Sequence, residues 1–326
     1  MTLTRILVIA AAGALAANAA AARDEIRIVG SSTVFPFSTA VAEQFGKTTD
    51  FPTPVVESTG SGGGIKLFCA GVGVEHPDIT NASRRMKASE FQTCQENGVT
   101  DVVESIIGYD GIVVANAEDG PAFSLTREQL VIALAEQGPK PKMWSEIDPS
   151  LPAIDIEVLG PPPSSGTRDA FEELVMEEGC EGAGIECEGI SIREDGAYVE
   201  AGENDNLIVS KLEANPSALG VFGFSFLDQN SDKLKGSTID GVEPTFDNIA
   251  EGGYPVSRSL FFYIKKAHVG VVPGIAEYAE EFASEAAMGE DGYLVDKGLI
   301  PLPEKAFDAN NERIETMTAM TGDELG

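Results

Sequence analysis

The sequence predicts an α/β protein with mainly parallel sheets flanked by helices. Short apolar strands alternate with segments of helical spacing along most of the chain, which is the pattern of strand–helix–strand units. Beyond a short leader the chain has roughly 300 residues, and a single hydrophobic core usually stops growing near that size. We therefore expect two domains, and we find no internal repeat.

The first 22 residues predict a secretory signal peptide. Arg5 and the amino terminus give a positive start, residues 6–17 are apolar, and residues 18–22 offer small-residue cleavage sites. A membrane span needs about 20 apolar residues, so this stretch is too short to be an anchor. No cysteine follows it, so a lipid-anchored form is not expected. We predict an exported, soluble protein of the periplasm.

Two strand–turn–helix units are predicted near the start of the chain. Residues 25–29 alternate in character as a short strand does, and residues 35–45 place three apolar side chains at helical spacing. A second strand at 55–56 runs into a turn rich in glycine and serine, and a short helix at 65–68 follows.

The same alternation continues to the end of the chain. Apolar runs within 101–114 indicate buried strand, and a helix at 126–136 is capped by Ser124 or Thr126, with Glu128 in its first turn. The remaining predicted elements are a strand at 154–159, an amphipathic segment at 168–178, a strand at 260–264 and a helix at 275–287.

The formal net charge of −31 argues against two classes of partner. Nucleic acid and anionic membrane surfaces both repel a strongly acidic protein. An acidic chain can still bind a small anion through short-range donors, because salt screens charges farther apart than about 8 Å.

Four cysteines predict two disulfides in an exported protein. Pairing Cys69 with Cys94 and Cys180 with Cys187 is the simplest of the three connectivities. A metal site is disfavoured, because no spacing is C-x-x-C and the two histidines lie far apart in sequence. We expect no metal and no cofactor.

Three turns share a design that suits an anion. Residues 30–33, 59–64 and 164–167 each follow a predicted strand, contain Ser or Thr with Gly, and precede a helix. A helix N-terminus presents unpaired N–H groups and partial positive charge, and hydroxyl groups add further donors. A single such turn is usually an ordinary helix cap, but three in one chain predict a small oxyanion held between them.

Catalytic motifs are absent from the sequence. It contains no G-x-S-x-G, no P-loop and no G-x-G-x-x-G after a strand. His76 precedes Pro77 in a polar loop, and His268 follows two lysines at what resembles an exposed strand end. We interpret both histidines as surface residues and predict that the protein is not an enzyme.

Four motifs together resemble the phosphate-binding proteins of phosphate ABC importers. They occur at 30–36, 60–66, 81–84 and 165–168, and residues 254–258 resemble the family's return into the first domain. The resemblance implies a two-lobed, type II periplasmic binding fold, with crossings near 108–114 and 254–263. The implied domains are the signal peptide at 1–22, lobe 1 at 24–110 and 257–326, and lobe 2 at 111–256.

The resemblance also implies the site and the role. A dehydrated anion would lie in the interlobe cleft, and a monomeric carrier would deliver it to a membrane permease, with no nucleic acid involved. The implied donors from lobe 1 are Ser32, Thr33 and the amide of Val34, with Ser61 and the amide of Gly62. Those from lobe 2 are Ser165, the amide of Gly166 and Thr167.

Two positions depart from the family pattern. Arg84 stands where members often have an Asp that accepts a proton from phosphate, and Pro161 stands where they often have an Arg. We expect the positive charge to be supplied by Arg84 and Arg168, whose planar guanidinium groups suit oxyanions. The alternatives are a solvated surface pair of Arg84 with Arg85, and an ion pair of Arg168 with the residue four positions later.

Losing that Asp leaves the ligand open between phosphate and other tetrahedral oxyanions, such as sulfate or molybdate. Asp110 and Asp169 are candidates for a replacement proton acceptor. A hydrolase of phosphate esters is the alternative from another functional class, and a sensor that presents phosphate status to a membrane receptor is a third.

Overall fold

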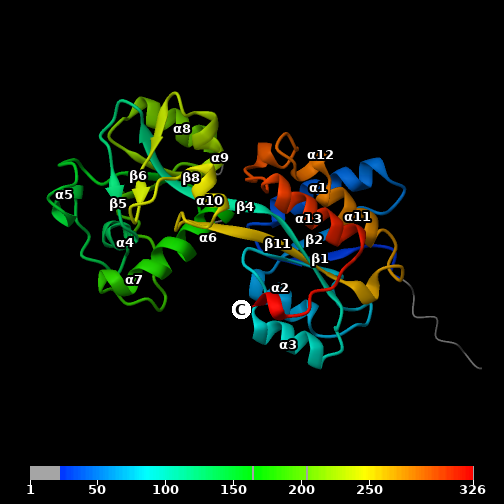
Figure 1. Ribbon diagram of the computed structural model, residues 1–326. Helices are drawn as coiled ribbons and strands as arrows, with labels where there is room; N and C mark the ends of the chain where they lie inside the picture. The colour runs from blue at the N-terminus through cyan, green and yellow to red at the C-terminus, as the bar shows by residue number, and fades with distance from the viewer. Residues whose placement is uncertain (1–22, 164, 203–204, 326) are drawn as a thin grey trace, which may run out of the picture.

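The computed structural model describes residues 23–163, 165–202 and 205–325, and it consists of two lobes joined by long strands (Figure 1). The predicted signal peptide, 1–22, lies outside the described residues. Within the described ranges no helix is long and apolar enough to cross a membrane. The predicted two-lobed α/β architecture is confirmed.

The first lobe is built on a sheet whose order is β2–β1–β3–β11–β4. The first three strands pair in parallel, whereas β11 is antiparallel to both of its neighbours. The strands are β1 (Arg27–Gly30), β2 (Val55–Ser58), β3 (Ile79–Ala82), β4 (Val102–Ala117) and β11 (Ser257–Lys265). The parallel strands β1 and β2 lead directly into the turns at 30–33 and 59–60, so those turns meet at one edge of the lobe.

Helices cover the first sheet and bury aromatic side chains against it. The apolar spacing predicted for the first helix is realised, since Val41 and Phe45 are completely buried and Phe45 packs edge-on against Tyr278, with ring centroids 5.8 Å apart. The helices are α1 (Phe35–Thr48), α2 (Ser61–Phe68), α3 (Ala88–Glu96), α11 (Ile275–Ala283), α12 (Glu285–Met288) and α13 (Glu304–Glu315).

The second lobe continues the same sheet from β4. Its order is β4–β8–β6–β7, with β9 also on β4 and a small pair of β5 with β10. The strands are β5 (Ser124–Leu125), β6 (Val158–Gly160), β7 (Tyr198–Glu200), β8 (Leu219–Gly223), β9 (Leu234–Gly236) and β10 (Thr238–Ile239). Here too the strands that lead toward the cleft, β6, β7 and β8, pair in parallel.

Helices of the second lobe pack around Trp144 and Phe171, both fully buried. Thr126 caps α4, because its hydroxyl accepts the amide of Gln129 at 3.1 Å. The helices are α4 (Arg127–Leu134), α5 (Trp144–Ile147), α6 (Gly166–Phe171), a π-helix (Glu172–Glu177), α7 (Glu178–Ala183), α8 (Asp205–Ala214), α9 (Phe224–Gln229) and α10 (Phe246–Ala250).

The lobes are joined by a ribbon of two strands. β4 pairs with β11 through residues 102–111 and then with β8 through residues 112–115, so it passes from one lobe into the other (Figure 1). The first residue of β11, Ser257, lies opposite Gly111 in that ribbon. Ile300 flanks it, exchanging backbone hydrogen bonds with Tyr109 at 2.8 and 3.0 Å.

Both predicted disulfides are present, Cys69–Cys94 and Cys180–Cys187.

The interpretation of His268 as a surface residue is wrong, because its side chain is buried. Its Nδ1 lies 2.6 Å from the buried carboxylate of Asp78, and its Nε2 lies 2.9 Å from the carbonyl oxygen of Val72.

Candidate functional site

The first turn lies between β1 and α1. Its hydroxyl groups already bridge to distant parts of the chain: Ser32 Oγ donates to Asp169 Oδ2 at 2.7 Å, and Thr33 Oγ1 accepts from Arg258 Nη2 at 2.7 Å. Val34 is buried, and its amide lies 3.4 Å from Ser31 Oγ. The turn therefore presents Ser32 and Thr33 to the cleft and keeps Val34 behind them.

Two glycines allow the second turn to lie against the first. A Cβ on Gly64 would come within 2.4 Å of Gly30 Cα, so only glycine lets α2 pack this closely on β1. Gly30 itself has φ +132° and touches the backbone of Asn81. This contact brings the start of α2, with Ser61 and Gly62, beside the first turn.

The second turn binds the loop after β3. Ser83 donates its amide to Ser61 Oγ at 3.0 Å, and their two hydroxyl oxygens also lie 3.0 Å apart. Next in the chain, Arg84 makes a two-pronged contact with Glu90, at 2.9 and 2.8 Å. Hydrogen bonding to Glu90 raises the pKa of Arg84, so its positive charge is secure.

The third turn begins α6 in the second lobe. Ser165 caps this helix, because its Oγ accepts the amide of Thr167 at 3.2 Å. A Cβ on Gly166 would come 3.1 Å from Thr33 Cα, so the two lobes are in close contact at a glycine. The first and third turns therefore face each other directly across the cleft.

Two cavities flank this contact, and Ser32 and Thr33 line both. The first cavity has a volume of about 420 Å³, and the second about 400 Å³. Predicted site residues lining the first are Ser32, Thr33, Ser165, Gly166 and Thr167; those lining the second are Ser32, Thr33, Ser61, Gly62 and Arg84. Eight of the ten predicted residues thus line one or both of these two neighbouring cavities.

Arg168 and Val34 are the two predicted residues that line neither cavity. Arg168 is buried, its Nε lies 2.7 Å from Glu172 Oε1, and its guanidinium stacks 4.4 Å from the ring centroid of Tyr198. This is the i+4 ion pair that the sequence left as the alternative. Arg168 holds α6 to β7 in this structure.

Sequence reasoning named Asp110 as a candidate proton acceptor but missed the arginine that lies against it, Arg258; Asp110 lines the first cavity and Arg258 the second. Arg258 of β11 lies opposite Asp110 of β4 in the ribbon, with Nε 3.5 Å from Oδ2. Besides Thr33, the guanidinium also donates through Nη1 to Glu173. Arg258 stands within the motif at 254–258 and Asp110 within the predicted crossing at 108–114, but only the strand register places them together.

The carboxylates that line the first cavity are unusually ready to hold a proton. Burial raises the pKa of Asp110, although Arg258 opposes the shift. Burial also raises the pKa of Asp205, to about 6, against a hydrogen bond from the amide of Gly223 at 3.2 Å. Asp205 can therefore either accept or donate a hydrogen bond near pH 6, and the pKa of Asp110 is shifted in the same direction.

The second cavity has opposite charges on its two sides. The first lobe contributes Arg84 and Arg258, and the second lobe contributes carboxylates from α6 and the π-helix. Those carboxylates belong to Asp169, Glu172, Glu173 and Glu177. Burial and neighbouring carboxylates raise the pKa of Glu177. Asp169 and Glu173 accept hydrogen bonds from Ser32 and Arg258, which are donors that an anionic ligand could use instead.

Comparison with known proteins gives a consistent result. A family model described as a PBP superfamily domain matches residues 15–286. Protein SphX of Synechococcus elongatus is 30% identical over 325 residues, covering 94% of this chain and 87% of its own length. Phosphate-binding protein PstS of Staphylococcus saprophyticus is 28% identical over 89% of this chain and 84% of its own.

A solved structure agrees with the sequence relatives. A possible phosphate binding protein from Planctomyces limnophilus superposes with a TM-score of 0.76 at 32% identity, covering 90% of this chain and 98% of its own. The family model spans most of the chain, and the relatives match along nearly the same length. This chain belongs to the PBP superfamily.

Proposed function

We propose that the chain is an exported solute-binding protein that captures inorganic phosphate between its lobes and delivers it to an ABC importer. The observation that carries this proposal is the meeting of three helix N-termini, from two lobes, around one cleft. Relatives named as phosphate-binding proteins support the choice of ligand.

Of the ten ligand residues predicted from sequence, eight are proposed to contact the anion and two to support those eight without contacting it. Hydroxyl groups of Ser32, Thr33, Ser61, Ser165 and Thr167 and the amides of Gly62 and Gly166 are the inner donors, with Arg84 beside them. Arg168 and the Val34 amide support them from outside the cavity lining. A hydrogen bond to a charged acceptor contributes roughly 1.5–3 kcal/mol, so a few of these give tight binding.

Arg258 and Asp110 are added to this set. Arg258 supplies the charge that Pro161 lacks, because its guanidinium already reaches Thr33 at the first turn. Asp110 supplies an acceptor for a phosphate proton, in place of the carboxylate missing at position 84. Sulfate carries no proton at neutral pH, so an ionised Asp110 would repel it and favour phosphate.

Binding rather than catalysis is supported by where the histidines lie. Within the described ranges, His76 and His268 line neither cavity, and His268 faces Asp78. No histidine is therefore placed to activate Ser61 or Ser165 as a nucleophile.

We propose lobe boundaries of 24–110 with 257–326 and 111–256, since the core of the second lobe draws almost wholly on residues 112–256.

The test is isothermal titration of the anion-stripped chain with phosphate, then with sulfate and molybdate, near pH 7.5. Micromolar or tighter phosphate binding without a sulfate signal is expected. Thr33→Val should weaken phosphate binding about tenfold or more, since it removes one hydrogen bond to a charged ligand. Thr48→Val, on the exposed side of α1, is the matched control and should bind normally.

Two results would replace this proposal. Binding of sulfate or molybdate without phosphate would assign the cleft to another oxyanion. Release of phosphate from a phosphate monoester, measured over hours with the same preparation, would assign it to a hydrolase.

A further inference from the structure

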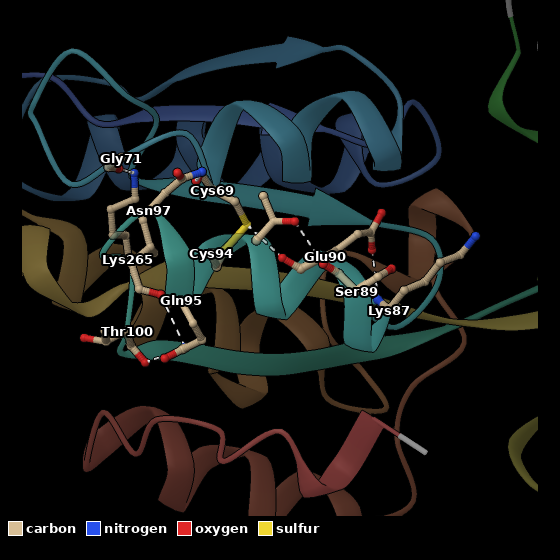
Figure 2. The surroundings of a disulfide bond; sticks show 12 residues. Cys69, Gly71, Lys87, Ser89, Glu90, Cys94, Gln95, Asn97, Thr100 and Lys265 are labelled. Carbon is tan, nitrogen blue, oxygen red and sulfur yellow. Dashed lines mark hydrogen bonds between the residues drawn. A yellow bond between two sulfur atoms is a disulfide. The ribbon is translucent and has the colours of Figure 1, made fainter.

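Two helices of the first lobe, α2 and α3, are joined by the disulfide Cys69–Cys94 (Figure 2). Cys69 follows the last residue of α2, and Cys94 lies in α3. Figure 2 shows Glu90 about one turn from Cys94 on α3. The disulfide thus links the C-terminal end of α2, whose N-terminus lies in the cleft, to α3, which carries Glu90, the partner of Arg84.

A closed cycle of contacts runs from this disulfide to the second cavity and back. Glu90 binds Nη1 and Nη2 of Arg84 at 2.9 and 2.8 Å. The residue before Arg84, Ser83, donates its amide to Ser61 Oγ at 3.0 Å. Ser61 begins α2, and Cys69 directly follows the last residue of this helix, so the disulfide closes the cycle. Three members of the cycle, Ser61, Ser83 and Arg84, line the cavity.

α3 depends on the disulfide for its place on the lobe. The structure describes all nine residues of this helix, and among them Cys94 alone is buried. Phe91 is half-buried, and just beyond the helix Asn97 Nδ2 donates to the carbonyl oxygen of Cys69 at 2.9 Å (Figure 2). Without the disulfide, few contacts remain to stop α3 from shifting and taking Glu90 with it.

Glu90 can direct Arg84 because its carboxylate is held ionised. Burial alone would raise the pKa of Glu90, but hydrogen bonds from Arg84 and from the amide of Lys87, at 2.8 Å, bring it below its usual value. A carboxylate that grips two nitrogens of a planar guanidinium fixes its direction as well as its position. That matters here because 29% of the Arg84 side chain is exposed, and besides Glu90 its guanidinium donates only a longer hydrogen bond, 3.2 Å, to the carbonyl oxygen of Arg85 in the described structure.

We propose that Glu90 and the Cys69–Cys94 disulfide are positioning elements of the anion site, which set its affinity by holding Arg84 in one orientation beside Ser61. Neither Glu90 nor the two cysteines line the two cavities beside the first turn, so they act through Arg84. The inference rests on the proposed binding of phosphate in this cleft.

The main test compares two disulfides of one chain. Cys69→Ser with Cys94→Ser removes the bond near the site. Cys180→Ser with Cys187→Ser removes the bond from α7 to the loop that follows it, and residues 178–187 line neither cavity. By titration with phosphate, the first variant should bind about tenfold more weakly, which corresponds to the loss of one charge-assisted hydrogen bond. The second variant should bind within about twofold of wild type. Equal affinities for the two variants would overturn the proposal.

A double-mutant cycle separates positioning from general loosening. In an Arg84→Met background, removing Cys69–Cys94 should weaken phosphate binding no further, because its target is gone. The same tenfold loss in that background would show that the disulfide acts elsewhere. If the disulfide variant fails to fold, Glu90→Gln carries the test, since it keeps the bond and the side-chain size, and its loss of affinity must likewise vanish with Arg84→Met.

A readout without ligand distinguishes failure of this inference from failure of the proposed function. A wild-type chain that does not bind phosphate would refute the function alone. The Arg84 side-chain Nε–H signal, observed by NMR in ¹⁵N-labelled protein, should be single and sharp in the ligand-free wild type. It should broaden or shift in the Glu90→Gln and Cys69→Ser/Cys94→Ser chains; an unchanged signal in both would refute the positioning role.

Discussion

Replacing Arg258 with methionine removes every hydrogen-bond donor of this side chain while keeping its apolar length. Arg258 faces Asp110 across the ribbon and donates to Thr33, so the change reaches both the crossing and the first turn. We expect Arg258→Met to lower both the affinity for phosphate and the free energy of unfolding.

The magnitudes follow from burial. The side chains of Arg258 and Asp110 are 7% and 14% exposed, so the variant leaves a nearly buried carboxylate without its partner. Breaking such a pair typically lowers the free energy of unfolding by about 3–5 kcal/mol. Losing a hydrogen bond to a charged ligand, worth roughly 1.5–3 kcal/mol, corresponds to about 10- to 150-fold weaker binding. Because Asp110 can take up a proton, the stability loss should shrink at acidic pH.

Phosphate titration and urea unfolding at pH 5 and pH 8 measure these two effects. Arg127→Met is the matched control, because Arg127 pairs with Asp240 at 2.7 Å with both side chains 30% exposed. Such a partly exposed pair contributes no more than about 1 kcal/mol. Adding Asp110→Asn to Arg258→Met should recover stability but not affinity. Phosphate binding within about twofold of wild type in Arg258→Met would refute the reasoning.

Three further predictions concern single positions. Gly166→Ala should weaken phosphate binding about tenfold by titration, because the new Cβ would lie 3.1 Å from Thr33 Cα and hinder closure; unchanged affinity would contradict this. The pKa of Asp205 is about 6 in the folded protein and about 3.9 in the unfolded chain. As the pH falls from about 6 to 4, the folded state therefore takes up a proton before the unfolded state does, and the free energy of unfolding of the wild-type chain should rise. Urea unfolding of Asp205→Asn should lack that rise, which is worth at most about 3 kcal/mol. Arg168→Met should lower the melting temperature yet bind phosphate within about twofold of wild type, since Arg168 packs on Tyr198 outside the cavity lining; a tenfold loss would place it at the ligand.

The site could be predicted from sequence where its parts are local. The turns at Ser32, Ser61 and Ser165 each need only a strand, a few small residues and a helix start, and these signals stand within ten residues of chain. Parallel strands end at one edge of a sheet, so such turns converge once the fold is right. The two disulfides were equally local, since each joins cysteines close in sequence.

The parts that depend on strand register could not be predicted. Arg258 and Asp110 meet because β11 and β4 pair in one particular register, and a single-residue slip would turn one of them to the other face. His268 was misjudged for a related reason: the polar residues around it resemble an exposed strand end. The fold instead places it against Asp78, whose buried carboxylate needs partners.

The two-stranded ribbon limits how the lobes can move. β4 and β11 are hydrogen-bonded to each other where they leave the first lobe, so neither strand can lengthen, slide or swivel without the other. The separation of the lobes at the ribbon is therefore fixed by backbone geometry. The motion left to the lobes is a change in the angle between them. Phosphate would then select among angles of a single joint.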